Sequence, residues 1–410
     1  MKPSPYSPTN NKKRKLSIIP SSNNLAISVE SMMNTNNNYN NIINEPFIDD
    51  IIFEILHFLD SLFIIQVCMK ISKQWRQISI QIPLSLSLNK HSEQDSLERI
   101  KYIANSECLK NLTSLRLYRN HFGDEDIKYI TNSKYLKNLT CLDLSDNKIG
   151  DEGIKYISNS ESLKNLTSLG LNYSYFGDEG VKYISNSEYL KNLTSLDLSE
   201  NGIECVKYIA NSECLKKLTF LDLSDNQIGN EGVKYIANSE CLNNLTSLRL
   251  CSNNIGIEGI KYIANHECLK NWTLLDLSEN EIGDEGVKYI ANSKYSQNLT
   301  SLDLRRDNIE STGANYIANS KYLKNLTSLN LNGNRILNEG VKYIAESEHL
   351  KRLRVLDLSF NRIDNRGIQY IANGGSLKNL TSLKLRDNEI DYEGLIAENV
   401  YLKNIVYLDS

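Results

Sequence analysis

The stretch Leu139–Asn165, LTCLDLSDNKIGDEGIKYISNSESLKN, decides how the chain folds, because close copies of it recur along most of the sequence. Most copies are 27 residues long, as from Leu139 to Leu166, and two are 25 residues long. Later copies open at Leu166, Leu193, Leu218, Leu245, Trp272, Leu299, Leu326, Leu353 and Leu380. A repeat of this length is typical of solenoids, in which each unit buries its apolar face against its neighbours.

Each copy predicts a strand, a turn, a short helix and a return. Leu142 and Leu144 alternate as residues of a strand do, so both point into one core. Asn147 ends the strand, and its amide can bond the backbone groups that a turn leaves open. Asp151 opens the helix, whose N-terminus favours negative charge, and the isoleucines that follow it have helical spacing.

The pattern Leu-x-x-Leu-x-Leu-x-x-Asn-x-Ile, from Leu139 to Ile149, resembles the leucine-rich repeat. The length and the helix of each unit resemble the ribonuclease-inhibitor-like subtype. The resemblance covers roughly residues 84–410 and about eleven copies. It implies an α/β solenoid shaped as a horseshoe, with a parallel sheet on the concave face and helices on the convex face. Proteins of this family usually bind other proteins.

Composition and repeats divide the chain into four regions. Residues 1–44 are rich in Asn and poor in apolar side chains, so we expect a disordered tail, because little apolar surface is available to offset the entropy of ordering. Residues 45–81 are an apolar segment predicted to be all-helical. Residues 82–111 are a degraded repeat that caps the array, and residues 112–410 hold the other repeats.

The net charge and the N-terminal sequence indicate which partners and which cell compartment to expect. The chain has 410 residues, 40% of them hydrophobic, and a net charge of −4, so no global basic field attracts nucleic acid or a membrane surface. No apolar run has the length of a membrane span and the N-terminus lacks a signal-peptide pattern, so we expect a cytoplasmic or nuclear protein. The basic run Lys12–Lys15 is either a nuclear localisation signal or a solvated patch in the tail.

The apolar segment, PFIDDIIFEILHFLDSLFIIQVCMKISKQWRQISI at residues 46–80, predicts two helices. One begins at Asp49 or Asp50, and a second extends from Ile64 through Ile71 to Trp75 with apolar residues at steps of three and four. Some 35 residues form too small a core to stand alone, so another surface must cover them. The segment either caps the first repeat or docks on a partner.

The residues DDIIFEILHFLD, followed by ISKQW, are similar to the F-box, although Phe47–Ile48 stands where that motif has Leu-Pro. The resemblance implies the substrate-recognition subunit of a Skp–cullin–F-box ubiquitin ligase, which directs protein substrates to ubiquitin-dependent degradation. The segment would bind a Skp-type adaptor and, through it, a cullin, and the repeats would bind the substrate. The adaptor contacts carried over by position are Phe47, Ile48, Ile51, Ile55, Leu56, Leu59, Val67 and Trp75. The alternatives are a leucine-rich-repeat scaffold or inhibitor without ligase association, and a GTPase-activating role.

The concave face is the candidate substrate-binding surface, because strand residues between the buried leucines point away from the core. Its candidate residues are Arg116, Tyr118, Asp143, Tyr173, Asp197, Phe220, Asp222, Asp276, Arg305, Arg306, Phe360, Lys384 and Arg386. The middle copies are acidic, whereas the ends carry arginines and aromatics. This pattern predicts a partner with a basic central patch, held by aromatic and Arg anchors. In the alternative interpretation, the Asp of each LDLS is only the regular residue of a solvated sheet.

No catalytic or cofactor motif is present in the sequence, so we expect a non-catalytic protein without metal or cofactor, in which any ubiquitin transfer is performed by partner subunits. Cysteines recur at one repeat position, where Tyr or Ser stands in other copies, so free thiols are expected rather than metal ligands. The recurrent Asn-Leu-Thr, first at Asn111, is interpreted as a repeat feature and not as a glycosylation site. The tyrosine column from Tyr129 to Tyr370 is predicted to pack between adjacent helices.

Overall fold

The computed structural model describes residues 68–79, 81–88 and 93–391, together with Ile52, Leu56, Ile64, Leu402, Val406 and Tyr407. The chain divides into Met1–Pro46, which lies outside these residues, and Phe47–Ser410, which contains all of them. The predictions of a disordered tail and of a nuclear signal at Lys12–Lys15 therefore fall outside the described residues.

One sheet of 13 strands runs through the described part of the chain, and each strand lies beside the next strand in sequence. The strands are β1 (Leu84–Ser87), β2 (Leu112–Arg116), β3 (Cys141–Asp143), β4 (Ser168–Gly170), β5 (Ser195–Asp197), β6 (Phe220–Asp222), β7 (Ser247–Arg249), β8 (Leu274–Asp276), β9 (Ser301–Asp303), β10 (Ser328–Asn330), β11 (Val355–Asp357), β12 (Ser382–Lys384) and β13 (Val406–Tyr407). Neighbouring strands are parallel and in register, with Leu142 beside Leu169 and Leu169 beside Leu196.

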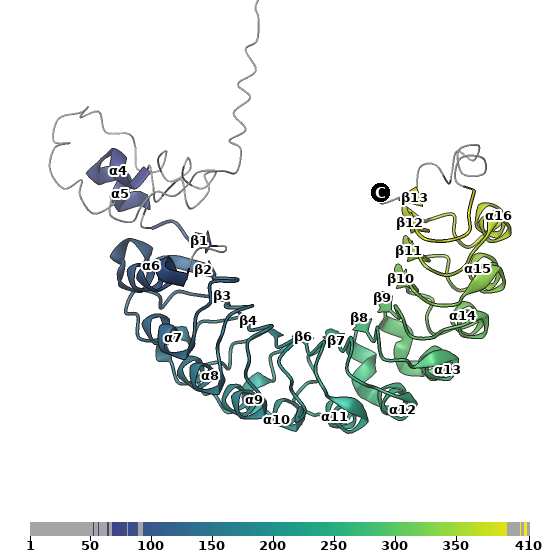
Figure 1. Ribbon diagram of the computed structural model, residues 1–410, viewed down its shortest axis with the longest axis horizontal. Coiled ribbons are helices and arrows are strands. Elements are labelled where there is room, and N and C mark those ends of the chain that lie inside the picture. The colour runs from purple at the N-terminus through teal and green to yellow at the C-terminus, as the bar shows by residue number, and fades with distance from the viewer. Residues whose placement is uncertain are drawn as a thin grey trace, which may run out of the picture. The chain divides into compact units, whose positions relative to one another are not determined.

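Short helices follow the strands and lie along the outer side of the curved repeat array, with the strands along its inner side (Figure 1). The helices of the array are α6 (Glu93–Asn105), α7 (Asp124–Thr131), α8 (Asp151–Ser158), α9 (Asp178–Ser185), α10 (Lys207–Ala210), α11 (Gly229–Ala237), α12 (Ile257–Asn265), α13 (Gly283–Asn292), α14 (Ser311–Ala318), α15 (Leu337–Glu346) and α16 (Asn365–Asn373). Two further helices, α4 (Met69–Ile71) and α5 (Lys73–Ser79), precede β1. Five 3₁₀ turns follow some of these helices: η2 (Glu107–Leu109), η3 (Glu161–Leu163), η4 (Glu213–Leu215), η5 (Glu267–Asn271) and η6 (Lys294–Asn298). The prediction of an α/β solenoid with a parallel sheet and helices is confirmed.

The core lies between the sheet and the helices. Leu142, Leu144, Ile154 and Ile157 are fully buried, as the strand and helix spacings predict. Trp272, which replaces the opening leucine of its repeat, is also buried. These side chains belong to one apolar cluster that extends through the array, so no repeat has a separate core.

The asparagine after each strand joins consecutive repeats. The amide nitrogen of Asn147 donates to the carbonyl oxygens of Leu117 and Leu144 at 2.9 and 2.7 Å. Its amide oxygen accepts from the backbone nitrogens of Asn120 and Phe122, each at 3.0 Å. Equivalent side chains at Asn201, Asn226, Asn253, Asn280, Asn334, Asn361 and Asn388 bond in the same way. This asparagine ladder satisfies buried backbone groups at the turns of these repeats.

The Asn-Leu-Thr triplets form two more ladders. The Asn138 amide donates to the Lys110 carbonyl at 2.8 Å, and the Thr140 hydroxyl donates to the Thr113 carbonyl at 3.1 Å. The triplet is therefore a structural feature of the repeat, as expected.

Most of the tyrosine column packs between adjacent helices. The Lys128 ammonium lies 4.7 Å from the centre of the Tyr156 ring, and the Lys155 ammonium lies 5.7 Å from that of Tyr183, so each lysine covers the tyrosine of the next repeat. The predicted packing is confirmed for Tyr156, Tyr183, Tyr208, Tyr289, Tyr316 and Tyr370, which lie half-buried against the core. Tyr129 and Tyr235 are instead exposed.

Candidate protein-binding surface

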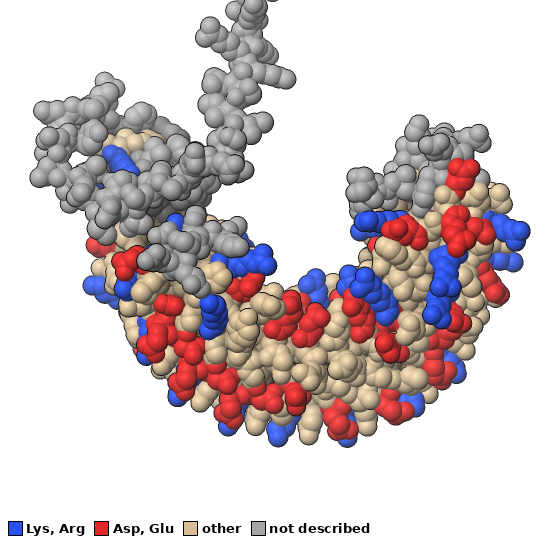
Figure 2. Space-filling view, in the orientation of Figure 1, with Lys and Arg blue, Asp and Glu red and all other residues tan. Residues whose placement is uncertain are grey.

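The inner face of the sheet is formed by residues that alternate with buried leucines. In β3, Cys141 and Asp143 are partly exposed on either side of buried Leu142. The parallel register places Asp143 beside Arg116 on one side and beside Gly170 on the other. Acidic and basic side chains both line the inner edge of the array (Figure 2).

The structure brings the predicted substrate-binding residues to this inner face and the turns that end its strands. Arg116, Asp143, Asp197, Phe220, Asp222, Asp276 and Lys384 belong to strands, whereas Tyr118, Tyr173, Arg305, Arg306, Phe360 and Arg386 follow within three residues of a strand's end. Tyr173, Arg306 and Phe360 have a left-handed backbone, with φ of 52°, 54° and 56°. These three residues occupy the same turn position in three different repeats, and this backbone conformation is uncommon for bulky side chains.

The regular aspartate of each LDLS has a structural role. The Asp143 carboxylate accepts from the backbone nitrogen of Ser145 at 3.1 Å, and Asp357 accepts from Ser359 at 3.0 Å. Such a bond caps the end of the strand within its own turn. This contact explains why the residue recurs in so many copies, so its regularity alone does not mark a binding residue.

A denser group of carboxylates lies on β3–β6. These strands and the three residues after each contain six acidic side chains and no Lys or Arg. We call them the acidic zone: Asp143, Asp146, Asp197, Glu200, Asp222 and Asp225. Two are neutralised by neighbouring arginines, Asp146 by Arg119 and Asp222 by Arg249 at 3.3 Å.

In the rest of the acidic zone, burial and the neighbouring carboxylates disfavour the ionised form of the acidic side chains. Burial raises the pKa of Glu200, and the carboxylates of Asp225 and Asp146 raise it further. Burial also raises the pKa of Asp197 and of Asp225. Among the residues that the structure describes, Glu200 and Asp225 form no ion pair. A cation brought to this position would therefore be attracted by carboxylates that have no cationic partner.

Three of the predicted arginine anchors, Arg305, Arg306 and Arg386, already lie close to an acidic side chain. The Arg306 and Arg305 guanidinium groups lie 3.5 and 3.9 Å from the Glu279 carboxylate. Arg119, which is not among the residues predicted from the sequence, pairs with Asp146 and lies 5.4 Å from the Tyr118 ring. These exposed pairs contribute little to stability, so they can exchange partners when a ligand binds.

Exposed aromatic rings lie close to the acidic zone. Tyr118 and Tyr173 are 37% and 45% exposed, and Phe360, toward the other end of the array, is 48% exposed. The sequence analysis missed Tyr175, which is 72% exposed and whose ring lies 6.1 Å from that of Tyr173. The signal was present in the sequence, because Tyr173-Ser174-Tyr175 replaces the polar triplet found in most repeats.

The segment that precedes the repeats contributes to the core. Ile52, Leu56 and Ile64 are buried and belong to the same apolar cluster as the first repeats. Trp75 is partly buried and packs against that cluster. The other predicted adaptor contacts, Phe47, Ile48, Ile51, Ile55, Leu59 and Val67, lie outside the described residues.

One prediction for this segment was wrong. The second helix does not continue through Ile71 to Trp75, because α4 ends at Ile71 and Ser72 is extended. The Ser72 hydroxyl accepts from the backbone nitrogen of Trp75 at 3.2 Å and so begins a new helix, α5. Ile71 is 53% exposed instead of lying in the buried stripe.

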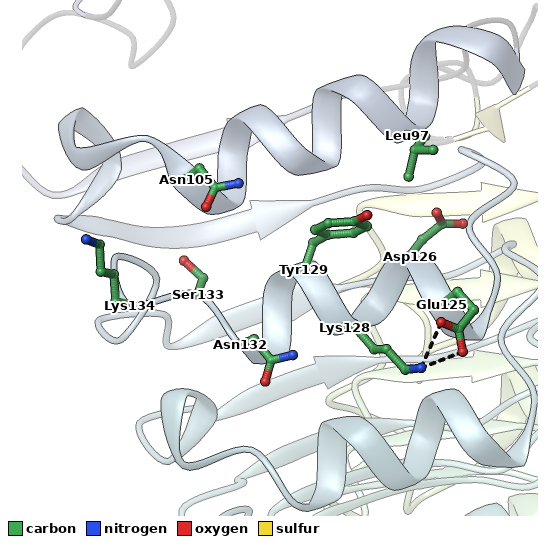
Figure 3. A pocket seen from close by; sticks show the side chains of 9 residues that line it. All are labelled: Leu97, Asn105, Glu125, Asp126, Lys128, Tyr129, Asn132, Ser133 and Lys134. Atoms are coloured by element: carbon green, nitrogen blue, oxygen red, sulfur yellow. Dashed lines mark hydrogen bonds and ion pairs between the residues drawn. The ribbon is translucent and has the colours of Figure 1, made fainter.

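A hollow on the outer side does not mark a separate site. It has a volume of about 570 Å³ and lies between α6 and α7, where Leu97 and Tyr129 project toward each other from the two helices (Figure 3). The Lys128 ammonium pairs with the Glu125 carboxylate at its edge. A similar hollow of about 430 Å³ lies beside α9. The hollow is therefore a recurring feature of helix packing.

The described residues contain no group of three or more His, Cys, Asp or Glu side chains that could hold a metal ion. No disulfide bond joins the eight cysteines, and burial raises the pKa of the thiols of Cys108, Cys214 and Cys241. Within the part of the chain that is described, no helix has the length and apolar character of a membrane span.

This architecture, a parallel sheet with one helix behind most strands, defines a class of solenoid repeat proteins. Within that class, nine segments match the family described as "Leucine Rich repeat": residues 108–130, 135–158, 189–204, 214–237, 241–264, 273–291, 322–345, 349–372 and 376–397. Residues 108–397 are therefore an array of leucine-rich repeats. The matches do not include residues 46–80, so the F-box resemblance stays a prediction.

Two solved structures are similar in fold. An internalin (inlF) from Listeria monocytogenes shares 23% identity with a TM-score of 0.47, covering 77% of this chain and 95% of its own. The leucine-rich-repeat ectodomain of the plant receptor kinase GASSHO1/SCHENGEN3 from Arabidopsis thaliana, in complex with CASPARIAN STRIP INTEGRITY FACTOR 2, shares 18% identity with a TM-score of 0.43. That match covers 82% of this chain and 39% of the receptor chain. No curated protein matches the chain.

Proposed function

We propose that the repeat array is a protein-binding scaffold and that the acidic zone on β3–β6 binds a basic stretch of its protein partner. The observation that carries this proposal is the excess of carboxylates over cations. Six acidic side chains and no Lys or Arg lie on β3–β6 and the three residues after each strand, and only two of the six pair with an arginine of a neighbouring repeat. A partner rich in Lys or Arg would relieve the repulsion among them.

The aromatic rings next to the acidic zone supply the apolar part of the contact. Tyr173 and Tyr175 are exposed on the turn after β4, between the turns after β3 and β5 that carry Asp146 and Glu200. Tyrosine is enriched among the side chains that dominate protein interfaces, because it buries a large area at a small entropic cost. We expect these rings to flank the basic side chains that pair with Glu200.

For the segment before the repeats we infer a docking role toward a Skp-type adaptor. The inference rests on the sequence resemblance of DDIIFEILHFLD and ISKQW to the F-box. In this proposal the chain is the substrate receptor of a cullin-based ubiquitin ligase in the cytoplasm or nucleus. Ubiquitin transfer belongs to the partner subunits.

The alternative is a scaffold or inhibitor without ligase association. The burial of Ile52, Leu56 and Ile64 in the common core favours it, because residues that cover the end of a solenoid are not available to an adaptor. Ile71 distinguishes the two functions. It is the most exposed apolar side chain of residues 68–79, so its replacement leaves the core intact.

The experiment is capture of a purified Skp-type adaptor by the full chain, by Ile71→Asp and by Ile257→Asp. Ile257 is the matched control, because it is 39% exposed on α12, far from the segment in sequence. The ligase proposal expects capture by the full chain and by Ile257→Asp, and at least tenfold weaker capture by Ile71→Asp. If the full chain captures no adaptor, the scaffold function remains.

A further inference from the structure

Asp307 occupies the position of the asparagine ladder between Asn280 and Asn334. The oxygen Oδ1 of Asp307 accepts from the backbone nitrogen of Asn280 at 2.9 Å, as an asparagine oxygen does in this ladder. The backbone nitrogen of Asp307 donates to the Asn334 amide oxygen at 3.0 Å. The carboxyl group thus replaces an amide between two repeats that keep the ladder asparagine.

The second oxygen of Asp307 has no suitable neighbour if the group is ionised. At the equivalent position, the Asn280 nitrogen donates to the carbonyl oxygens of Leu250 and Leu277, both at 2.8 Å. By the same pattern, Oδ2 of Asp307 faces backbone carbonyl oxygens, which only accept. Asp307 is fully buried, and its Oδ2 has no hydrogen-bond partner. A carboxylate here would face acceptors without a donor, which is costly in a buried site.

We propose that Asp307 is held as a neutral carboxylic acid whose Oδ2 carries the proton, and that this repeat is a pH-sensitive joint in the array. As a neutral acid, Oδ2 can donate to a carbonyl and so restore the bond that the asparagine makes in other repeats. Loss of the proton places an uncompensated charge between β8 and β10. The end of β9 and the turn that carries Arg305 and Arg306 on the inner face would then loosen.

Burial and the neighbouring carboxylates also favour the protonated form of Asp307. The pKa of Asp307 is raised from 3.8 to about 8, chiefly by burial and to a smaller extent by the carboxylates of Asp303 on β9 and Asp276 on β8. The backbone nitrogens of Asn280 and Ile282 oppose this shift but are outweighed. On the β10 side the bonded group is the uncharged Asn334 amide.

The direction of the pH effect follows from linkage. Because the folded-state pKa lies above the unfolded value of 3.8, the stability contributed by protonated Asp307 is complete below pH 3.8. It decreases as the pH rises and is lost at about pH 8. Other carboxylates also titrate, so only a comparison at position 307 isolates this group.

Two single variants of the full chain test the proposal. Asp307→Asn restores the ladder side chain, and Asn334→Asp introduces the same carboxyl one repeat later. Thermal unfolding is measured from pH 5 to pH 9. We expect the melting temperature of Asp307→Asn to exceed that of the wild type by a margin that widens by about 5 °C over this range. Asn334→Asp should acquire a comparable additional loss at high pH.

Direct titration of the Asp307 carboxyl carbon by NMR provides a second readout. A titration midpoint above pH 7 supports the proposal. A midpoint below pH 5, or melting curves of Asp307→Asn and wild type that stay parallel at every pH, overturns it.

Discussion

The carboxylate of Asp151 lies 2.8 Å from the backbone nitrogen of Gly180, one repeat later, and accepts its hydrogen bond. The same oxygen accepts from Gly177, the N-cap of α9, at 3.0 Å. Asp151 is itself the first residue of α8. The side chain therefore caps the helix of the following repeat and joins two helices on the outer side, as the asparagine ladder joins two turns.

Removal of this cap is expected to weaken α9. Asp151→Ala should cost about 1 kcal/mol, because two backbone N–H groups lose their acceptor. Asp151→Asn is the matched control, since Asn230 naturally makes the same contacts with Gly256 and Gly259, both at 2.9 Å. Hydrogen exchange at the amides of Gly177 and Gly180 measures the effect. We expect roughly fivefold faster exchange in Asp151→Ala and little change in Asp151→Asn; equal exchange in both would contradict the capping role.

The glycine that receives the cap has no room for a side chain. A Cβ at Gly180 would lie 2.7 Å from the Phe176 ring and 2.9 Å from the Asp151 carboxylate, whereas a Cβ at Gly177 would meet nothing within 4 Å. Gly180→Ala is therefore expected to lower the free energy of unfolding by about 1–3 kcal/mol, and Gly177→Ala by much less. Chemical denaturation of the two variants measures the difference. Equal stability of both variants would show that the close contact is not the cause.

Ser174 interrupts the asparagine ladder and offers a gain in stability. Ser174 is fully buried, and its short side chain donates only to the Asn172 carbonyl, at 3.4 Å. Ser174→Asn should extend the ladder toward the neighbouring repeat and stabilise the chain by about 1 kcal/mol, which raises the melting temperature by a few degrees. Ser174→Ala removes the weak bond and provides the control. A melting temperature of Ser174→Asn at or below the wild-type value would contradict this prediction.

Most of the fold could be predicted from the sequence, because the repeat places each residue in a local pattern. The alternation of Leu142 with Leu144, the turn at Asn147 and the helical spacing after Asp151 each reflect interactions within a few residues. The role of Asp151 was only partly predictable. The sequence assigns its charge to its own helix, but its bonding partners lie 26 and 29 residues later.

The candidate surface was predictable as a face but not as a network of charges. Strand alternation identifies Asp143 and Arg305 as inner-face residues, yet it does not reveal that one caps its own turn and the other lies near Glu279. Whether Glu200 forms an ion pair depends on the side chains that the neighbouring repeats place beside it, and the pattern of a single repeat does not show this. The break at Ser72 depends on a single hydroxyl bond to Trp75, which competes with helical continuation.

The charge of the acidic zone should control partner binding. Glu200→Lys combined with Asp225→Lys reverses two exposed carboxylates that have no ion pair in the described part of the chain, so the fold should be retained. The proposed contact predicts at least a tenfold loss of affinity, because attraction becomes repulsion. The same reversal at Glu152 and Glu179 on the outer helices is the control, and loss of binding in both would contradict a specific role for the acidic zone.

The most direct measurement of where a partner binds is site-specific photo-cross-linking in cells. A photo-reactive phenylalanine analogue replaces Tyr173 on the inner face or Tyr235 on the outer helix α11, which are 45% and 44% exposed. The account predicts a discrete protein adduct from position 173 that disappears when Glu200→Lys and Asp225→Lys are added, and no such adduct from position 235. Equal adducts from the two positions, or an adduct at 173 that is indifferent to the charge reversal, would contradict it.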